Sequence, residues 1–146
     1  MTHKRQDGRT LDGTIRILSG AAEVSAQASI RFVDGYCREA VFLEPGEDFA
    51  GAVTSVRFLG AGAERRVEVF RQGALESYTQ FALSGPTKGH YRLAEGALTF
   101  TIVTHRLDVL QESGELQAVI DAVINFDAQT ESHVRTRILL TWSEER

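Results

Sequence analysis

Hydrophobic and polar residues alternate along the chain with a period of two, most clearly between residues 97 and 127. Leu98, Phe100 and Ile102 alternate with threonines. Successive side chains of a β-strand point to opposite faces, so this period places one face of each strand on a core and the other in water. The pattern predicts antiparallel β-structure. The next stretch repeats it over a longer run, whose apolar positions are Leu116, Ala118, Ile120, Ala122, Ile124 and Phe126.

Turn signals divide the chain into ten predicted strands. Asp34-Gly35 is a hairpin signal, because a type I′ turn needs positive φ at both central residues. Gly85-Pro86 ends another strand, since proline cannot donate to a β-ladder. Residues 44–48 open the one longer connection, which has room for a helical turn around Phe49 and Ala50. The predicted strands cover residues 14–19, 27–34, 36–44, 52–59, 64–72, 74–84, 88–94, 97–110, 114–127 and 132–142.

These strands favour one all-β domain. The connections are too short for a regular set of parallel crossovers, which argues against βαβ topology. Closure of the sheet removes exposed edges, and small inward residues such as Ala118 and Ala122 fit the inside of a barrel. We predict a single antiparallel up-and-down β-barrel of about 8–10 strands over residues 14–146, with at most a short helical turn. A flexible tail is expected at residues 1–13, and a β-sandwich remains the alternative fold.

Composition narrows the classes of function. The chain has 146 residues and a net charge of −4, and a mildly acidic chain is a poor binder of nucleic acid. It has no apolar run long enough to span a membrane and no apolar N-terminal segment typical of a secretory signal. Its single cysteine, Cys37, excludes an internal disulfide framework. We therefore expect a cytoplasmic protein that binds no nucleic acid and does not span a membrane.

On two predicted strands, polar side chains lie on the same face as the apolar residues that point into the barrel. Arg71 continues the row of Val69, whereas Thr104 and Arg106 continue the row of Ile102. A buried guanidinium without partners is costly. Arg71 is therefore expected either to close one barrel end through hydrogen bonds or to meet the carboxylate or phosphate of a ligand. Arg106 follows a potential bulge and is equally compatible with a solvated position.

Catalytic and metal-binding constellations are missing from the sequence. The four histidines are scattered and have no metal-ligand spacing, and no Gly-x-Ser-x-Gly elbow is present. Glu44, Glu47 and Asp48 lie in one loop, which we interpret as a solvated acidic loop rather than a cation site. We predict no catalytic residue, no metal and no cofactor.

Short motifs between Val67 and Thr104 resemble those of a known family. An Arg-x-Gly is followed by Phe, Tyr, Gly and Thr, at Arg71, Gly73, Phe81, Tyr91, Gly96 and Thr104. In this order the chain resembles, over residues 14–141, the YwiB-like family of small bacterial proteins, a domain of unknown function. The resemblance implies a calycin-like, lipocalin-type β-barrel and a cytoplasmic bacterial protein. It carries no established activity.

Three classes of function remain open. The first is non-catalytic binding of a small apolar or amphiphilic ligand inside the barrel or at its mouth, with Arg71, Tyr91, Thr104 and Arg106 as candidate contacts. The second is a protein–protein interaction module with a filled barrel, which acts through a surface or a homodimer face. The outward apolar residues Val103, Val119 and Val123 would form that face. The third is an enzyme with a polar pocket, which no residue spacing favours. A cavity in the barrel would separate the first class from the second.

Overall fold

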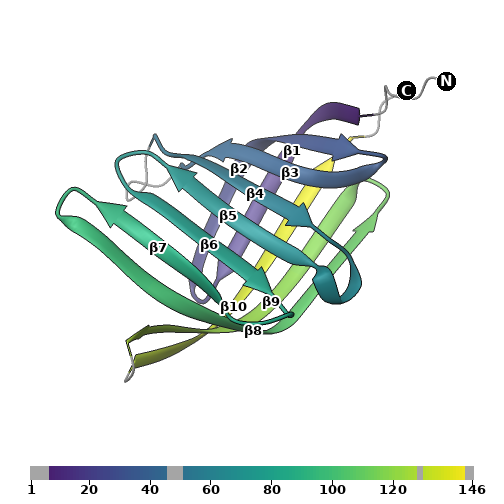
Figure 1. Cartoon of the computed structure of the whole chain (residues 1–146). Coiled ribbons are helices and arrows are strands. Elements are labelled where there is room, and N and C mark those ends of the chain that lie inside the picture. Colours follow the sequence, from purple (N-terminus) through teal and green to yellow (C-terminus); the bar gives the residue numbers. More distant parts are fainter. Residues whose placement is uncertain (1–6, 46–50, 128–129, 144–146) are drawn as a thin grey trace.

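The computed structural model describes residues 7–45, 51–127 and 130–143. Ten strands form one closed antiparallel barrel, in which consecutive strands pair and β1 also pairs with β10 (Figure 1). The strands are β1 (Asp7–Ser19), β2 (Ala22–Val33), β3 (Tyr36–Leu43), β4 (Val53–Leu59), β5 (Arg66–Gln72), β6 (Glu76–Ala82), β7 (Thr87–Leu93), β8 (Gly96–Glu112), β9 (Glu115–Asp127) and β10 (Thr130–Trp142). The predicted barrel is therefore confirmed, and the sandwich alternative is wrong.

The boundaries of two predicted features differ from the structure. β1 begins at Asp7, so the predicted boundary between tail and barrel at residue 13 falls inside a strand. This part of β1 has few apolar residues, and it is held by pairing with β2, for example Leu11 with Ile30. The helical structure of the described residues is one 3-10 turn, η2 (Gly62–Glu64), between β4 and β5. The turn expected around Phe49 and Ala50 lies outside the described residues.

The inward side chains form one hydrophobic core. Nine of the ten strands contribute buried residues to a single cluster, and Tyr91 of β7 packs against it. Ile30, Val56, Val67 and Ile120 are completely buried within this cluster. Burial of these side chains from around the barrel stabilises its closure, because each strand covers the apolar face of the others.

A bulge in β8 changes which face its second half presents. Thr104 pairs with Ala122 and Arg106 pairs with Asp121, so His105 is an extra residue without an opposite neighbour. The inserted residue shifts the alternation by one position. As a result Thr104 and Leu107 are both buried, while Arg106 lies outside and pairs with Asp108 at 2.6 Å. The prediction that Arg106 continues the inward row is wrong for this reason.

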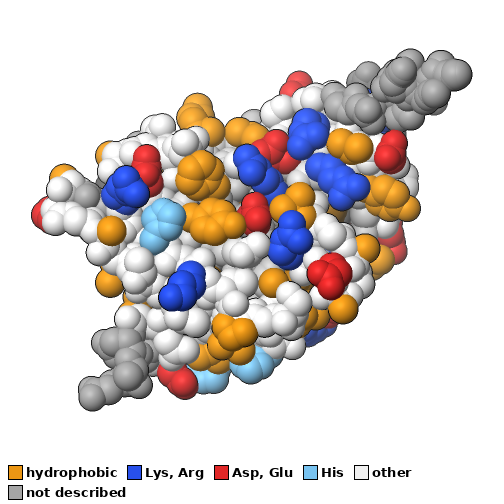
Figure 2. Space-filling model, viewed as in Figure 1, with side chains coloured by type: hydrophobic (Ala, Val, Ile, Leu, Met, Phe, Trp, Pro, Cys, Tyr) orange, Lys and Arg blue, Asp and Glu red, His pale blue; other side chains and the backbone are white. Residues whose placement is uncertain are grey.

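The outer surface carries interleaved charges of both signs. Figure 2 shows basic and acidic side chains alternating with apolar ones on one face of the barrel. Glu39 accepts hydrogen bonds from Ser55 and Arg57 and also lies 3.5 Å from Arg31. Burial raises the pKa of Glu39, but these partners outweigh burial and hold that pKa below its usual range.

Candidate functional site

Arg71 and Tyr91 lie in one row of cross-strand neighbours at one end of the barrel. Thr54 of β4 faces Arg71 of β5, Arg71 faces Ser77 of β6, and Ser77 faces Tyr91 of β7. Opposite residues of neighbouring strands are close enough for their side chains to interact. The structure thus brings two of the sequence-predicted site residues to the same end of the barrel.

The Arg71 guanidinium is neutralised by a carboxylate of the protein. Its Nε lies 3.1 Å from Glu44 Oε2, and its Nη1 donates to Ser77 Oγ at 3.1 Å. Thr54 Oγ1 donates to the same Glu44 oxygen at 2.6 Å. The Glu44 side chain is 2% exposed and that of Arg71 is 19% exposed. Of the two roles open to Arg71, this geometry supports closure of the barrel end.

The sequence interpretation placed Glu44 in a solvated acidic loop, but the structure buries its side chain. It follows β3 directly, and its N–H donates to the carbonyl of Ala52 at 2.9 Å, which holds the carboxylate beside Arg71 rather than in solvent. Glu47 and Asp48, the other members of the predicted acidic loop, lie outside the described residues. The signal available in the sequence was Arg71 itself, since an arginine in an apolar row requires a nearby carboxylate.

Tyr91 has an aromatic neighbour, and Thr104 has a buried hydroxyl. Tyr91 packs against the Phe100 ring with centroids 5.3 Å apart, and Phe100 packs in turn on Phe126. Thr104 is 8% exposed, and its hydroxyl has no hydrogen-bond partner within the described residues. A buried hydroxyl in this state is open to a polar atom of water or a ligand.

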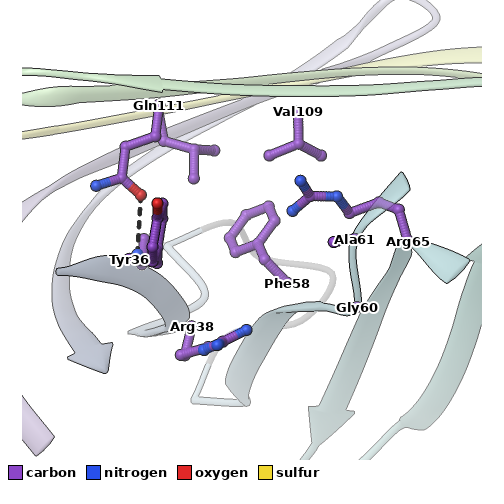
Figure 3. A pocket seen from close by; sticks show the side chains of 10 residues that line it. Tyr36, Arg38, Phe58, Gly60, Ala61, Arg65, Val109 and Gln111 are labelled. Atoms are coloured by element: carbon purple, nitrogen blue, oxygen red, sulfur yellow. Dashed lines mark hydrogen bonds between the residues drawn. The ribbon is translucent and has the colours of Figure 1, made fainter. Parts of the chain in front are cut away.

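The opposite end of the barrel contains a pocket of about 490 Å³ (Figure 3). It lies where β3 and β9 begin and where β4 and β8 end. Phe58 and Leu116, each 1% exposed, form its deep apolar wall together with Val109. The complete lining is Tyr36, Cys37, Arg38, Phe58, Gly60, Ala61, Arg65, Val109, Gln111 and Leu116.

Two arginines give this pocket a positive charge. Arg38 and Arg65 are both half-buried in the pocket lining, which contains no carboxylate. In the view of Figure 3, the Phe58 ring lies between their guanidinium groups. The ion pairs found in the described part of the chain include neither arginine.

A second bulge positions Arg38. Arg31 of β2 pairs with Glu39 and Phe32 pairs with Cys37, so Arg38 is an extra residue on β3. A bulge of this kind redirects a side chain and is common beside functional sites. Arg65 comes from the other side, directly after η2, where its N–H donates to Gly62. Alternation along single strands did not predict either position, because each depends on a local break in the ladder.

Gln111 ties together strands that are not neighbours in the barrel. Its Nε2 donates to the carbonyl of Gly35, and its Oε1 accepts from the N–H of Cys37, both at 2.9 Å. The second bond is the dashed line in Figure 3. Because Gln111 lies on β8 and Cys37 on β3, this side chain bridges across the barrel end and forms one wall of the pocket.

The lining of the pocket holds a single thiol and no histidine or carboxylate. Burial raises the pKa of the Cys37 thiol to about 12, so the thiol is protonated at neutral pH and is a poor nucleophile. The lining contains no histidine and no carboxylate to serve as a general base. Across residues 7–45, 51–127 and 130–143, no group of three or more His, Cys, Asp or Glu residues is placed to hold a metal ion.

The outward valines proposed as an interaction face are largely covered. Val103 and Val123 are direct cross-strand neighbours, but Val123 is only 7% exposed within the single chain. Val103 and Val119 are half-buried. Together they present little free apolar surface. Within the described residues, no helix is both long and apolar enough to cross a membrane.

Comparison with known proteins gives a family without an assigned activity. The family model described as Domain of unknown function (DUF1934) matches residues 20–138. No curated protein matches the chain. The crystal structure of the ywiB protein from Bacillus subtilis is similar with a TM-score of 0.76 and 13% identity, covering 98% of this chain and 100% of that chain. The chain therefore belongs to the DUF1934 family, which confirms its resemblance to YwiB-like proteins.

Proposed function

We propose that this protein binds a small amphiphilic ligand without catalysis, in the pocket between Arg38, Phe58 and Gln111. The observation that carries the proposal is a pocket of about 490 Å³ that joins an apolar wall to a polar rim. Small-molecule sites typically have volumes of roughly 300–1,000 Å³ and combine apolar linings with few polar groups. The pocket therefore has the size and the lining of a ligand site.

The two ends of the barrel support different roles. At the Arg71 end, the inward charge already has its carboxylate partner in Glu44. At the pocket end, apolar side chains and polar groups are both available to a ligand. The unpartnered hydroxyl of Thr104 is a further polar atom inside the barrel. Arg71 is therefore assigned a structural role in this proposal, and the ligand contacts move to the opposite end.

The test uses a neutral apolar dye, N-phenyl-1-naphthylamine, whose fluorescence rises in an apolar environment. We expect saturable binding of one dye per chain. Ala61 lines the pocket and is exposed, so Ala61→Trp fills the mouth without changing the core. Ala63→Trp is the matched control, because Ala63 is also exposed and follows in the same turn but does not line the pocket.

Two results would contradict the proposed function. One is the absence of saturable dye binding to the parent protein. The other is equal binding by the parent and Ala61→Trp, which would place the dye elsewhere on the molecule. Loss of binding in Ala61→Trp with retention in Ala63→Trp supports the pocket as the site.

A further inference from the structure

We infer that the ligand of this pocket carries an anionic head group, a carboxylate or a phosphate, which the two arginines of the lining, Arg38 and Arg65, attract. This inference rests on the proposed function, since it specifies the polar end of the same ligand. Its basis is the charge of the lining, which has two guanidinium groups and no carboxylate. An anion is the partner that guanidinium groups bind most strongly, through charge-assisted hydrogen bonds.

Most arginines elsewhere in the described part of the barrel have a carboxylate partner. Seven arginines in the described part of the chain form ion pairs with Asp or Glu, most of them on the outer surface. Arg16, Arg92 and Arg135 each have such a partner although more than half of each side chain is exposed. Arg38 and Arg65 are less exposed, yet no acidic residue within the described ranges pairs with them.

Partial burial makes an external anion favourable at this position. A half-buried guanidinium loses part of its hydration, and two of them in one pocket repel each other. An anion in the pocket reduces both effects, and the apolar wall strengthens the attraction because it lowers the local dielectric. The net charge of the chain is −4, so the attraction is a local property of the pocket rather than of the whole protein.

The bulge in β3 is consistent with this role. In a regular strand, a residue beside the inward-facing Cys37 would point outward. The extra residue in the ladder instead turns the Arg38 side chain into the lining that also contains Cys37. The structure therefore places a charged side chain beside an apolar wall at the cost of one interrupted pairing.

The test compares four probes with the same eight-carbon chain: octanoate, octyl phosphate, octan-1-ol and octylammonium. Binding to the full chain is measured by calorimetry at low and high salt. We expect both anions to bind more tightly than the alcohol, by roughly 10- to 100-fold, and the ammonium to bind most weakly. Higher salt should weaken the binding of the anions because both arginines are partly exposed. The ratio of octanoate to octyl phosphate affinity distinguishes the two head groups.

The variants Arg38→Gln and Arg65→Gln test the two contacts. Each is expected to weaken binding of the preferred anion by roughly tenfold or more and to leave octan-1-ol binding unchanged. Arg57→Gln is the matched control, because Arg57 lies on the outer face beside Glu39. Circular dichroism of each variant verifies that the barrel is intact.

Failure of the anionic head group and failure of the proposed ligand site give different results in these experiments. Equal binding of octanoate and octan-1-ol, with no effect of Arg38→Gln or Arg65→Gln, would overturn the anionic head group and leave the amphiphile site intact. Failure of all four probes and of the neutral dye would overturn both proposals. Equal weakening by the Arg57→Gln control would show that only the overall charge of the protein matters and would also reject the inference.

Discussion

At the level of single residues, the arginines at the two ends of the barrel have different surroundings. Arg71 reaches inward, and its charge meets Glu44, whose side chain is almost inaccessible to water. Arg38 and Arg65 are half-buried beside apolar side chains without a carboxylate in the same lining. A paired charge holds the protein together, whereas a charge without a protein partner is available to a ligand.

Arg71→Ala is expected to lower the free energy of unfolding by about 3–5 kcal/mol, because it leaves the Glu44 carboxylate buried without a cation. Urea denaturation measures this change. Arg106→Ala is the control, since Arg106 and Asp108 are each at least half exposed and such pairs contribute at most about 1 kcal/mol. Adding Glu44→Gln to Arg71→Ala should recover part of the loss. Equal stability of Arg71→Ala and the parent would refute the closing role of Arg71.

Because the Cys37 thiol is buried, we expect the protein to lose stability at alkaline pH. Burial raises the pKa of its thiol from 9.0 to about 12. Below pH 9 the thiol is protonated in both states, but above pH 9 the unfolded chain loses the proton while the folded chain keeps it. Stability therefore falls as pH rises, by up to about 1.4 kcal/mol per pH unit for this group.

The Cys37→Ala variant isolates this effect. The difference in unfolding free energy between parent and Cys37→Ala should shift by about 1–2 kcal/mol between pH 9 and pH 10.5, against the parent. Urea denaturation at several pH values measures it. A difference that stays constant across this range would mean that the thiol is accessible to water in the folded protein.

At the level of elements, close packing between strands depends on particular glycines. Gly89 of β7 lies opposite Phe100 of β8. A Cβ at Gly89 would overlap the Phe100 ring and would lie 2.7 Å from the carbonyl oxygen of Tyr78 on β6. The aromatic ring therefore packs directly over the backbone of the neighbouring strand.

Gly89→Ala is expected to destabilise the barrel by about 1–3 kcal/mol, because the Phe100 ring must move. Gly85→Ala is the control, since a Cβ at Gly85 meets no atom within 4 Å. Thermal unfolding of both variants measures the difference. Equal melting temperatures for the two variants would show that the β7–β8 contact tolerates the added methyl group.

The strands were predictable because alternation is a local property of the sequence. All ten appear, and β9 follows its apolar row from Leu116 to Ile124. The bulges at Arg38 and His105 were not predictable, since an extra residue is defined only by the register of the partner strand. The pocket lies beside the first of these bulges. The sequence therefore predicted the barrel, but neither this pocket nor the end of the barrel where it lies.

At the level of the whole molecule, one closed core separates two unlike ends. The core cluster contains residues from nine strands. Pairing of β1 with β10 closes the sheet, so no open edge remains between them. One end contains the buried Arg71–Glu44 ion pair, and the other contains the pocket bridged by Gln111. With this difference between the ends, we expect the Arg71 end to contribute stability and the opposite end to bind the ligand.

The most direct test is a titration of isotope-labelled protein with octanoate, followed by NMR chemical-shift changes of the backbone amides. We expect saturable changes around Cys37, Val109 and Gln111, and none around Thr54 and Ser77 at the Arg71 end. Changes that gather at the Arg71 end would contradict the assignment of the two ends. The absence of any change would contradict the binding of an anionic amphiphile by this barrel.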